Sequence, residues 1–293
     1  MRYLAVLLCL GACDHTVDGQ KPVGGNVDSD AEIQRYLRRA YLDLTGHAPS
    51  DTELADATTQ LREQTNTPTA RGTFVDGLLQ SSTFATVYID ELENNVFGGN
   101  DLDSQYAFVC GIIRGTVPAC QTCTSNDSCA CQCANLPSYL SEREALRTTE
   151  TDYAGGMSSS AIERRYAMAQ GYYVLAGTPE GIASSLFDDF LGRPAEADEI
   201  ENGRNMVIGA LLPGSPAGLL FHRHGSNYGD LVDIVFTSEV YREAMVRRTF
   251  NRYLARDPSS GELAHFVASL DATDPDARSL VRAVVASREY FDQ

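Results

Sequence analysis

The chain has 293 residues, with 23 Lys or Arg against 40 Asp or Glu, which gives a formal net charge of −17 at pH 7 and a pI near 4.6. Such acidity disfavours binding to nucleic acid or to anionic membranes, because both require a positive surface potential. A hydrophobic content of 43% and a charged content of 22% are ordinary for a folded protein, and the length is sufficient for a large buried core.

Lys21 is the only lysine, so almost all of the positive charge is arginine. The folded body therefore lacks a phosphate-binding Gly-Lys-Ser/Thr loop, a Schiff-base lysine and a Ser-x-x-Lys acyl-transfer site. A genome that prefers arginine codons explains the bias without any function, but these reaction classes are excluded either way.

The N-terminus reads as an export signal. Arg2 precedes an apolar run from Leu4 to Leu10, which is too short to span a bilayer as a mature helix. The tetrapeptide Leu10-Gly11-Ala12-Cys13 resembles the bacterial lipoprotein box. This resemblance implies that residues 1–12 are removed and that Cys13 is acylated. The alternative is an ordinary signal peptide that happens to contain Cys13.

Residues 13–30 are polar and rich in glycine, with no apolar periodicity, and they predict a flexible tether. No later segment approaches the roughly 18 apolar residues that a spanning helix needs. We therefore expect a body attached to a membrane of the cell envelope through the lipid on Cys13, either in the outer membrane or on a membrane that faces the periplasm.

Three segments of the body share a helical pattern that ends at a proline. We call them the first, second and third proline segments (residues 37–49, 187–194 and 246–258). In the first, apolar residues at Ile33, Leu37, Ala40, Tyr41 and Leu44 fall on one helical face. After the proline, Ser50 with Glu53 and Ser259 with Glu262 predict capping boxes that open a second helix. The second segment has Ala195 at this place, so its second helix is expected to start less sharply.

Each copy closes with an eight-residue stretch that ends in serine. We call these the serine octapeptides (residues 74–81, 231–238 and 280–287), and an aromatic residue follows each serine at the third position. The serines predict N-caps, and the aromatic residues Phe84, Tyr241 and Tyr290 predict core positions. The recurrence predicts a repeated helical unit with variable connecting segments. Chance similarity between amphipathic helices is the alternative, most of all for the second copy.

These motifs carry two family resemblances. Tyr41-Leu42-Asp43-Leu44-Thr45-Gly46-x-x-Pro49, followed by Leu78-Leu79-x-Ser81-x-x-Phe84, resembles the planctomycete-type domain of unknown function found beside cytochrome c modules. The Leu-Gly-Arg-x-Pro and Ser-x-x-Tyr/Phe patterns of copies two and three resemble the helical domain related to phycobilisome linkers, which occurs in extracellular and surface-layer proteins. Together they cover about residues 33–92 and 182–293. They imply a helical extracytoplasmic fold and carry over no catalytic residue.

Further capping signals extend the helical prediction between the copies. Ser29 with Glu32, Ser141 with Glu144 and Ser160 with Glu163 predict capping boxes, and Thr178-Pro179 predicts an N-cap followed by proline at the first helical position. No sustained strand alternation is present. The sequence thus predicts an all-α fold of repeated helical units with a disulfide-rich loop insert. The expected boundaries are 1–12 for the signal, 13–30 for the tether, 31–98 for an N-terminal helical unit, 99–137 for a Cys-rich insert and 138–293 for a C-terminal body with further units at 182–242 and 243–293.

Six cysteines lie close together in a polar segment that cannot build its own core. They are Cys110, Cys120, Cys123, Cys129, Cys131 and Cys133. An even count in an exported chain favours three disulfides, and six connectivities remain if each of the last three pairs with one of the first three. Zinc or iron–sulfur ligation is the alternative, although the insert contains no histidine. Haem attachment is excluded because Thr124 follows Cys123.

Three other patterns suggest sites only weakly. His222 and His224 in a Gly-rich stretch could hold a metal, and residues 100–104 have the Asn and Asp content of a calcium loop without its glycine and terminal glutamate. Ser160 after Gly155-Gly156 suggests a nucleophile, but a helix N-terminus capped by Ser160 explains it better. The acidic residues 188–189 and 196–201 predict solvated helix faces.

The sequence assigns no catalytic residue, no cofactor and no metal site. We expect a lipid-anchored extracytoplasmic structural or protein-binding module with a protein partner and no nucleic acid. The alternatives are an accessory subunit of a cytochrome-linked or degradative surface complex and a metal-binding protein that uses the cysteine cluster.

Overall fold

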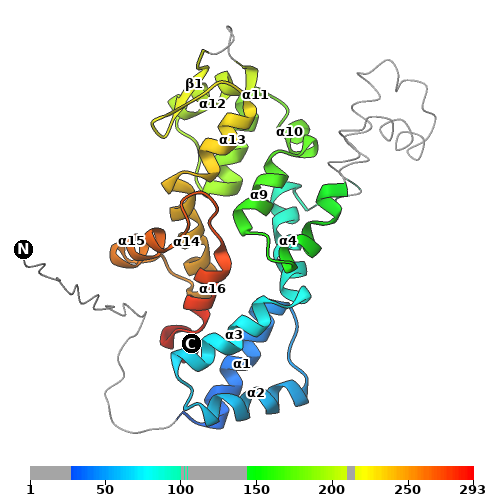
Figure 1. Cartoon of the computed structure of the whole chain (residues 1–293), viewed down its shortest axis with the longest axis vertical. Coiled ribbons are helices and arrows are strands. Elements are labelled where there is room, and N and C mark those ends of the chain that lie inside the picture. Colours follow the sequence, from blue (N-terminus) through cyan, green and yellow to red (C-terminus); the bar gives the residue numbers. More distant parts are fainter. Residues whose placement is uncertain (1–27, 100–101, 103, 105–143, 210–214) are drawn as a thin grey trace, which may run out of the picture.

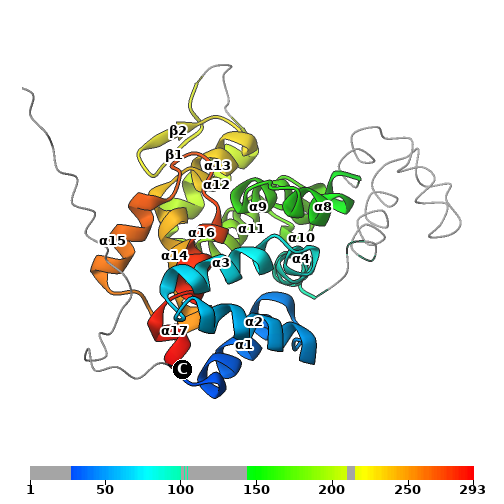
Figure 2. The same cartoon turned by 60° about the horizontal axis from the view of Figure 1, so that its bottom comes forward.

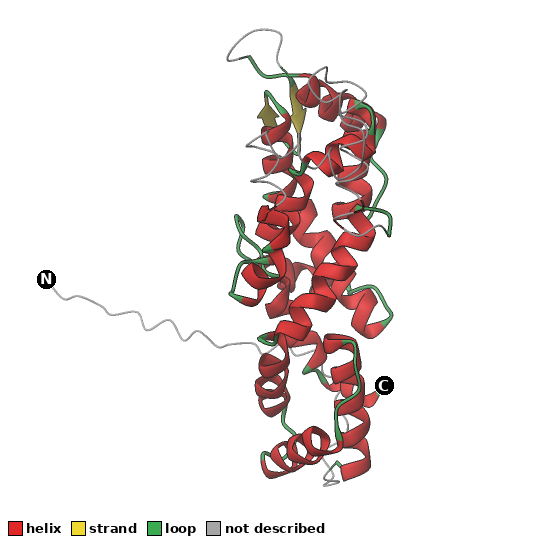
Figure 3. Ribbon diagram, turned by 90° about the vertical axis from the view of Figure 1, so that its right-hand side faces the viewer, coloured by secondary structure: helices red, strands yellow, loops and turns green. Residues whose placement is uncertain are grey.

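A computed structural model describes residues 28–99, 102, 104, 144–209 and 215–293 (Figure 1). Within these residues the fold is mostly helical, and its only sheet is one short hairpin (Figure 3). The predicted all-α class is therefore confirmed. None of the helices in this part of the chain combines the length and the hydropathy of a membrane span.

The described part of the chain begins with four helices, of which the first three lie at one end of the elongated molecule and the fourth runs beside α9 (Ser159–Ala167) (Figure 1). They are α1 (Asp30–Thr45), α2 (Asp51–Glu63), α3 (Pro68–Leu79) and α4 (Ser82–Val96). After residues 105–143, which lie outside the described part, come α8 (Thr149–Ala154), α9 (Ser159–Ala167), α10 (Gln170–Ala176) and α11 (Pro179–Leu186), and α11 continues as the π-helix η2 (Phe187–Leu191).

The rest of the chain returns along the molecule to the first helices. It comprises α12 (Ala197–Ile208), the antiparallel strands β1 (Gly218–Leu220) and β2 (Arg223–Gly225), α13 (Tyr228–Phe236), α14 (Glu239–Leu254), α15 (Ser260–Ser269), α16 (Ala277–Val285) and α17 (Arg288–Asp292). The hairpin pairs Gly218 with Gly225 in the Gly-rich stretch where no strand was expected.

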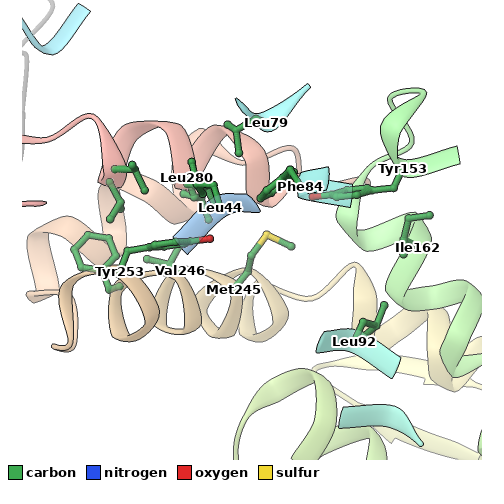
Figure 4. Packing of buried hydrophobic residues seen from close by; sticks show 14 of the residues in the cluster. Leu44, Leu79, Phe84, Leu92, Tyr153, Ile162, Met245, Val246, Tyr253 and Leu280 are labelled. Carbon is green, nitrogen blue, oxygen red and sulfur yellow. The ribbon is translucent and has the colours of Figure 1, made fainter. Parts of the chain in front are cut away.

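The N-terminal and C-terminal helices share one core. In Figures 1 and 2, α3 lies beside α16, and the C-terminal end of the chain reaches α1, which it contacts through α17. Tyr36 of α1 packs edge-on against Tyr290 of α17, with ring centroids 5.9 Å apart. Figure 4 shows Val246 and Met245 of α14 pointing toward Leu280 and Phe84. Buried residues from Ile33 to Phe291 form a single continuous cluster.

The predicted caps decide where most of these helices begin. Ser29, Ser50 and Ser259 form capping boxes with Glu32, Glu53 and Glu262. Thr178 caps α11, with Pro179 at its first position. The serines that end the octapeptides cap α4, α14 and α17, and the aromatic residues three positions later are buried, as predicted: Ser81 with Phe84, Ser238 with Tyr241, and Ser287 with Tyr290.

Two predicted helix starts are wrong. Ser158, not Ser160, caps α9, and Glu163 turns into the core instead of completing a box. After the second proline segment the next helix, α12, begins as sharply as the others although no serine precedes it, because Glu196 takes its N-cap position. The Glu199 carboxylate accepts the backbone N–H of Glu196 at 2.8 Å, as Glu53 does for Ser50.

The turns that follow α1, η2 and α14 have the same geometry. Each helix ends in a left-handed residue, at Gly46 (φ 73°), Gly192 (φ 64°) and Ala255 (φ 53°). In the second and third turns an arginine comes next and binds the box glutamate through two hydrogen bonds, Arg193 to Glu199 at 2.8 and 2.7 Å and Arg256 to Glu262 at 3.0 and 2.8 Å. In the first turn His47 takes the place of the arginine, with its ring 6.5 Å from that of Tyr41.

Candidate functional site

A pocket of about 240 Å³ lies between α4 and α14, and we call it the α4–α14 pocket. Residues of α8, α9 and α16 complete its lining. Its apolar and aromatic walls come from Phe84, Val87, Tyr88, Leu92, Tyr153, Met245, Tyr253, Ala277 and Val281. Its polar lining consists of Glu91, Asn95, Glu163, Arg248, Thr249 and Arg252. Figure 4 shows Phe84 and Tyr153 on the side opposite α14.

Helical spacing places these side chains together. Phe84, Tyr88, Glu91 and Asn95 follow one another at intervals of three or four residues on α4, so they share one face of that helix. Met245, Arg248 and Arg252 do the same on α14. Because each face carries apolar residues near one end and polar residues near the other, the pocket has an apolar part and a polar rim.

Glu163 of α9 is the buried charge of this site, with a side chain only 5% exposed. Its Oε1 accepts the hydroxyl of Tyr88 at 2.8 Å, and its Oε2 accepts the hydroxyl of Tyr241 at 2.9 Å. The Nη2 group of Arg248 donates to both oxygens at 3.2 and 3.1 Å. We call these four residues the Glu163 network. It ties α4, α9 and α14 together and supplies the partners that a buried carboxylate requires.

The two tyrosines of the network are fixed donors. Burial, followed by the negative charge of Glu163, raises the pKa of both Tyr88 and Tyr241 well above the usual value of 10. Tyr88 also stacks on Tyr153, with ring centroids 4.4 Å apart. Both phenols therefore stay protonated at neutral pH and continue to donate to Glu163. This arrangement holds charge and orientation, which suits binding, whereas acid–base catalysis needs a group that exchanges protons near the working pH.

An ion pair crosses the rim of the pocket. Arg252 of α14 contacts Glu91 of α4, and its Nη2 group also donates to the backbone oxygen of Asp43 at 3.3 Å. Asn95 lies exposed near this rim. The rim thus joins the N-terminal helices to α14, while Arg248, whose side chain is 37% exposed, lies further along the same face of α14.

Most residues that the sequence singled out as sites lie outside the described part of the chain. This holds for Cys13, for all six cysteines of the insert, for most of residues 100–104 and for Ser141. The predicted lipidation and disulfides therefore stay predictions.

The histidine pair lies on the hairpin. His222 is in its turn with φ 62° and His224 is in β2, and both side chains are exposed. Within the described ranges no group of three or more His, Cys, Asp or Glu side chains is arranged to hold a metal ion.

Ser160 does not have the partners of a nucleophile. Its hydroxyl donates to Asp274 at 2.9 Å, and the neighbouring Ser159 donates to Asp276 at 3.0 Å. These bonds attach the start of α9 to the loop before α16. A serine nucleophile needs a base such as histidine to take its proton, and here each serine faces a carboxylate that holds it in place.

The acidic runs are less solvated than expected. Asp189 is half-buried in η2 and accepts the hydroxyl of Tyr172 at 2.9 Å. Burial raises the pKa of Asp189 to about 6, and the adjacent Asp188 adds to this effect. Glu199 forms the ion pair with Arg193 described above. The remaining acidic residues of the two runs fit the prediction, since all of them are exposed: Asp188, Glu196, Asp198 and Glu201.

Sequence reasoning missed the α4–α14 pocket. Its one available signal was Glu163, a charged residue on the helical face of α9 that also carries Ile162, Tyr166 and Ala167. A lone carboxylate on an apolar face predicts a buried partner, but it does not say which distant residues supply it. Comparisons with protein-family models, with curated proteins and with solved structures found no match to this chain.

Proposed function

We propose that the chain is a lipid-anchored extracytoplasmic protein whose helical body is a structural or protein-binding module and not an enzyme. Attachment through Cys13 follows from the lipoprotein-like box and the tether of residues 13–30. The observation that carries the rest is the turn geometry shared after α1, η2 and α14, because it supports the interpretation of the body as repeated helical units of the kind that the two resembled families use.

The Glu163 network supports a binding role over a catalytic one. Its carboxylate and both phenol hydroxyls are engaged with one another, and its phenols hold their protons at neutral pH. The arginines of the body are largely used in internal ion pairs, such as Arg193 with Glu199 and Arg256 with Glu262. Because the chain carries 40 acidic against 23 basic residues, electrostatic complementarity favours a partner with a basic face.

The insert is proposed to hold three disulfides among Cys110, Cys120, Cys123, Cys129, Cys131 and Cys133. Metal ligation by these cysteines is the second candidate, since their spacing also fits a ligand set. Thiol titration of the denatured, unreduced protein, together with elemental analysis, separates the two. Disulfides predict no free thiol and no stoichiometric metal.

Anchoring is tested by fractionating cells that express the full chain, with intact mass measured on the product. The expected wild-type protein sediments with membranes and has the mass of an acylated chain that begins at Cys13. The Cys13→Ser variant is expected to lose the acyl mass, while Cys9→Ser, a change within the signal, keeps both anchoring and mass. A mature wild-type chain without Cys13, or one without acyl mass, would refute the proposal.

A further inference from the structure

The α4–α14 pocket has hydrogen-bond donors to spare and few acceptors. Glu163 already accepts three groups, Glu91 is engaged by Arg252, and the Thr249 hydroxyl donates to the backbone oxygen of Met245 at 2.9 Å. In the described part of the chain, the hydrogen bonds of Arg248 use only its Nη2 group. The other N–H groups of this guanidinium are therefore available, and the side chain is 37% exposed.

Arg248 keeps unengaged N–H donors on its open side even though it is paired with Glu163. The charge of Glu163 is shared among the guanidinium and two phenol hydroxyls, so Arg248 is not its sole partner. The negative net charge of the whole chain repels an anionic ligand in the pocket only weakly, because salt screens exposed charges that are more than about 8–10 Å away. At the pocket itself, Arg248 and Arg252 balance Glu163 and Glu91, and the charged groups left to interact are N–H donors, with the Asn95 amide at the rim.

The remaining lining selects for an apolar body of limited size. Phe84, Met245 and Val281 are almost fully buried and form walls that offer no polar partner. The volume of about 240 Å³ is below the range of about 300–1,000 Å³ that takes drug-sized molecules. One aromatic ring or one short branched chain fits this space.

We propose that the α4–α14 pocket binds a small organic acid, with its carboxylate on the free N–H groups of Arg248 and its apolar body between α4 and α14. Guanidinium groups bind carboxylates through short, charge-assisted hydrogen bonds. An ammonium ligand would meet Arg248 without an unengaged carboxylate beside it. A sugar would place hydroxyl groups against walls that cannot bond them, which costs free energy. Binding of this acid is an activity beyond the proposed function. It requires neither the lipid anchor nor a protein partner.

Two kinds of molecule carry a carboxylate beside an apolar group of this size. A free acid carries one carboxylate and one apolar group, and so does the C-terminal residue of a peptide that ends in phenylalanine or leucine. Both place the carboxylate on Arg248, but only the peptide continues out of the pocket past Asn95 and the rim. Phenylacetate and N-acetyl-Gly-Phe therefore serve as the two probes, and whichever binds more tightly identifies the source.

The test is isothermal titration of the full chain, purified in detergent, with phenylacetate, isovalerate, N-acetyl-Gly-Phe and the neutral isostere phenylacetamide. We expect at least one acid to bind, and the amide to bind at least tenfold more weakly than phenylacetate. Arg248→Gln should weaken acid binding at least tenfold. The matched control is Arg247→Gln, one residue away on the exposed face of α14, which should leave the affinity within twofold.

A second variant tests the pocket in case Arg248→Gln fails to fold. Ala277→Leu adds volume to the pocket wall without removing a charge, and it should abolish acid binding while thermal unfolding stays cooperative. Equal binding of phenylacetate and phenylacetamide, unchanged binding by Arg248→Gln, or no binding of any acid at 5 mM would each overturn the proposal. None of these outcomes depends on whether the chain carries a lipid.

Discussion

Glu163 shows how one residue decides the character of the α4–α14 pocket. A carboxylate removed from water costs several kcal/mol unless its lone pairs are satisfied. Here Tyr88, Tyr241 and Arg248 satisfy them from two other helices. The same bonds that stabilise the charge also orient Arg248 toward the pocket, so the site and the core depend on one another.

Asp189 provides a pH-dependent contribution to stability. Its pKa is raised to about 6 in the folded state, against 3.8 for the free side chain, so the folded protein favours the protonated form. The contribution of Asp189 to the free energy of unfolding is therefore fully present below about pH 4 and is lost as the pH rises toward 6 and above. We expect Asp189→Asn to raise the free energy of unfolding at pH 7.5 by about 1–3 kcal/mol and to flatten its dependence on pH between 4 and 7.

Urea unfolding across this pH range measures the effect. The control is Glu201→Gln, an exposed acidic residue of α12 that takes no part in the raised pKa of Asp189, for which a change of less than about 0.5 kcal/mol is expected. If Asp189→Asn were destabilising at pH 7.5, or as pH-dependent as the wild type, this account of Asp189 would be wrong.

At the scale of helices, local sequence signals were sufficient for most boundaries. Cap residues act on the backbone a few positions away, so Ser50 and Ser259 could be assigned without knowledge of the fold. The second turn was misread because its proline is one residue early, whereas the left-handed Gly192 and the box residue Glu199 keep the spacing of the other copies. The spacing common to the three turns is that between the left-handed residue and the box glutamate, not that to the proline.

The elements that the sequence missed depend on distant contacts. The helix start after α9 follows the serine–aromatic rule with Ala169 in place of serine, so only the buried Tyr172 remains as a signal. The hairpin β1–β2 packs on α12, where the Asn202 side chain accepts the backbone N–H of Leu219 at 2.8 Å. Neither feature is visible in the local hydrophobic pattern.

Arg256 stabilises the third turn through two carboxylates. It donates to Glu262 and also to Glu289 of α17, at 2.6 and 2.7 Å, and hydrogen bonding from Arg256 lowers the pKa of Glu262 to about 2. This stabilisation is present above about pH 4.5 and is lost as the pH falls toward 2. Because the groups are partly exposed, we expect Arg256→Gln to cost only about 1–2 kcal/mol at pH 7.

Chemical unfolding at pH 7 and pH 2.5 checks this prediction. The difference between Arg256→Gln and the wild type should shrink at the lower pH, where Glu262 approaches protonation. Arg247→Gln, an exposed change in α14, the helix that precedes this turn, should show no such difference. A penalty that is equal at both pH values would mean that Arg256 acts through packing on Phe250, over which it lies at 5.2 Å, and not through charge.

At the scale of the whole molecule, the first and last helices fold as one body. Asp76 of α3 accepts Nε of Arg282 of α16 at 2.8 and 2.9 Å, and the Tyr290 hydroxyl donates to Asp43 of α1 at 2.7 Å. These contacts join residues about two hundred positions apart. No local pattern encodes such a pairing, so the sequence could predict the two helical regions but not that they share a core.

Removal of residues 288–293 should therefore destabilise the N-terminal helices as well. The truncation takes away Tyr290 and Phe291, which pack on Tyr36 at 5.9 and 5.4 Å. Loss of a buried aromatic side chain costs about 3–5 kcal/mol, so a loss of at least about 3 kcal/mol is expected. Hydrogen exchange should show faster opening of α1. Removal of Gln293 alone takes away only a long hydrogen bond to the backbone oxygen of Leu254, at 3.4 Å, and should leave exchange in α1 unaltered. Unaltered exchange in α1 after removal of residues 288–293 would contradict a shared core.

The 16 residues of α14 have a consequence for how this chain can vary in length. One face of the helix carries Met245 and Arg248 to the pocket, and Phe250, near the C-terminal end, carries the ring over which Arg256 of the following turn lies. Each residue of an α-helix advances the side chains by about 100° around the axis. A single inserted or deleted residue between Arg248 and Phe250 would turn one of these faces outward. We therefore expect length changes to be excluded from α14 and confined to connections that make no contact with other elements.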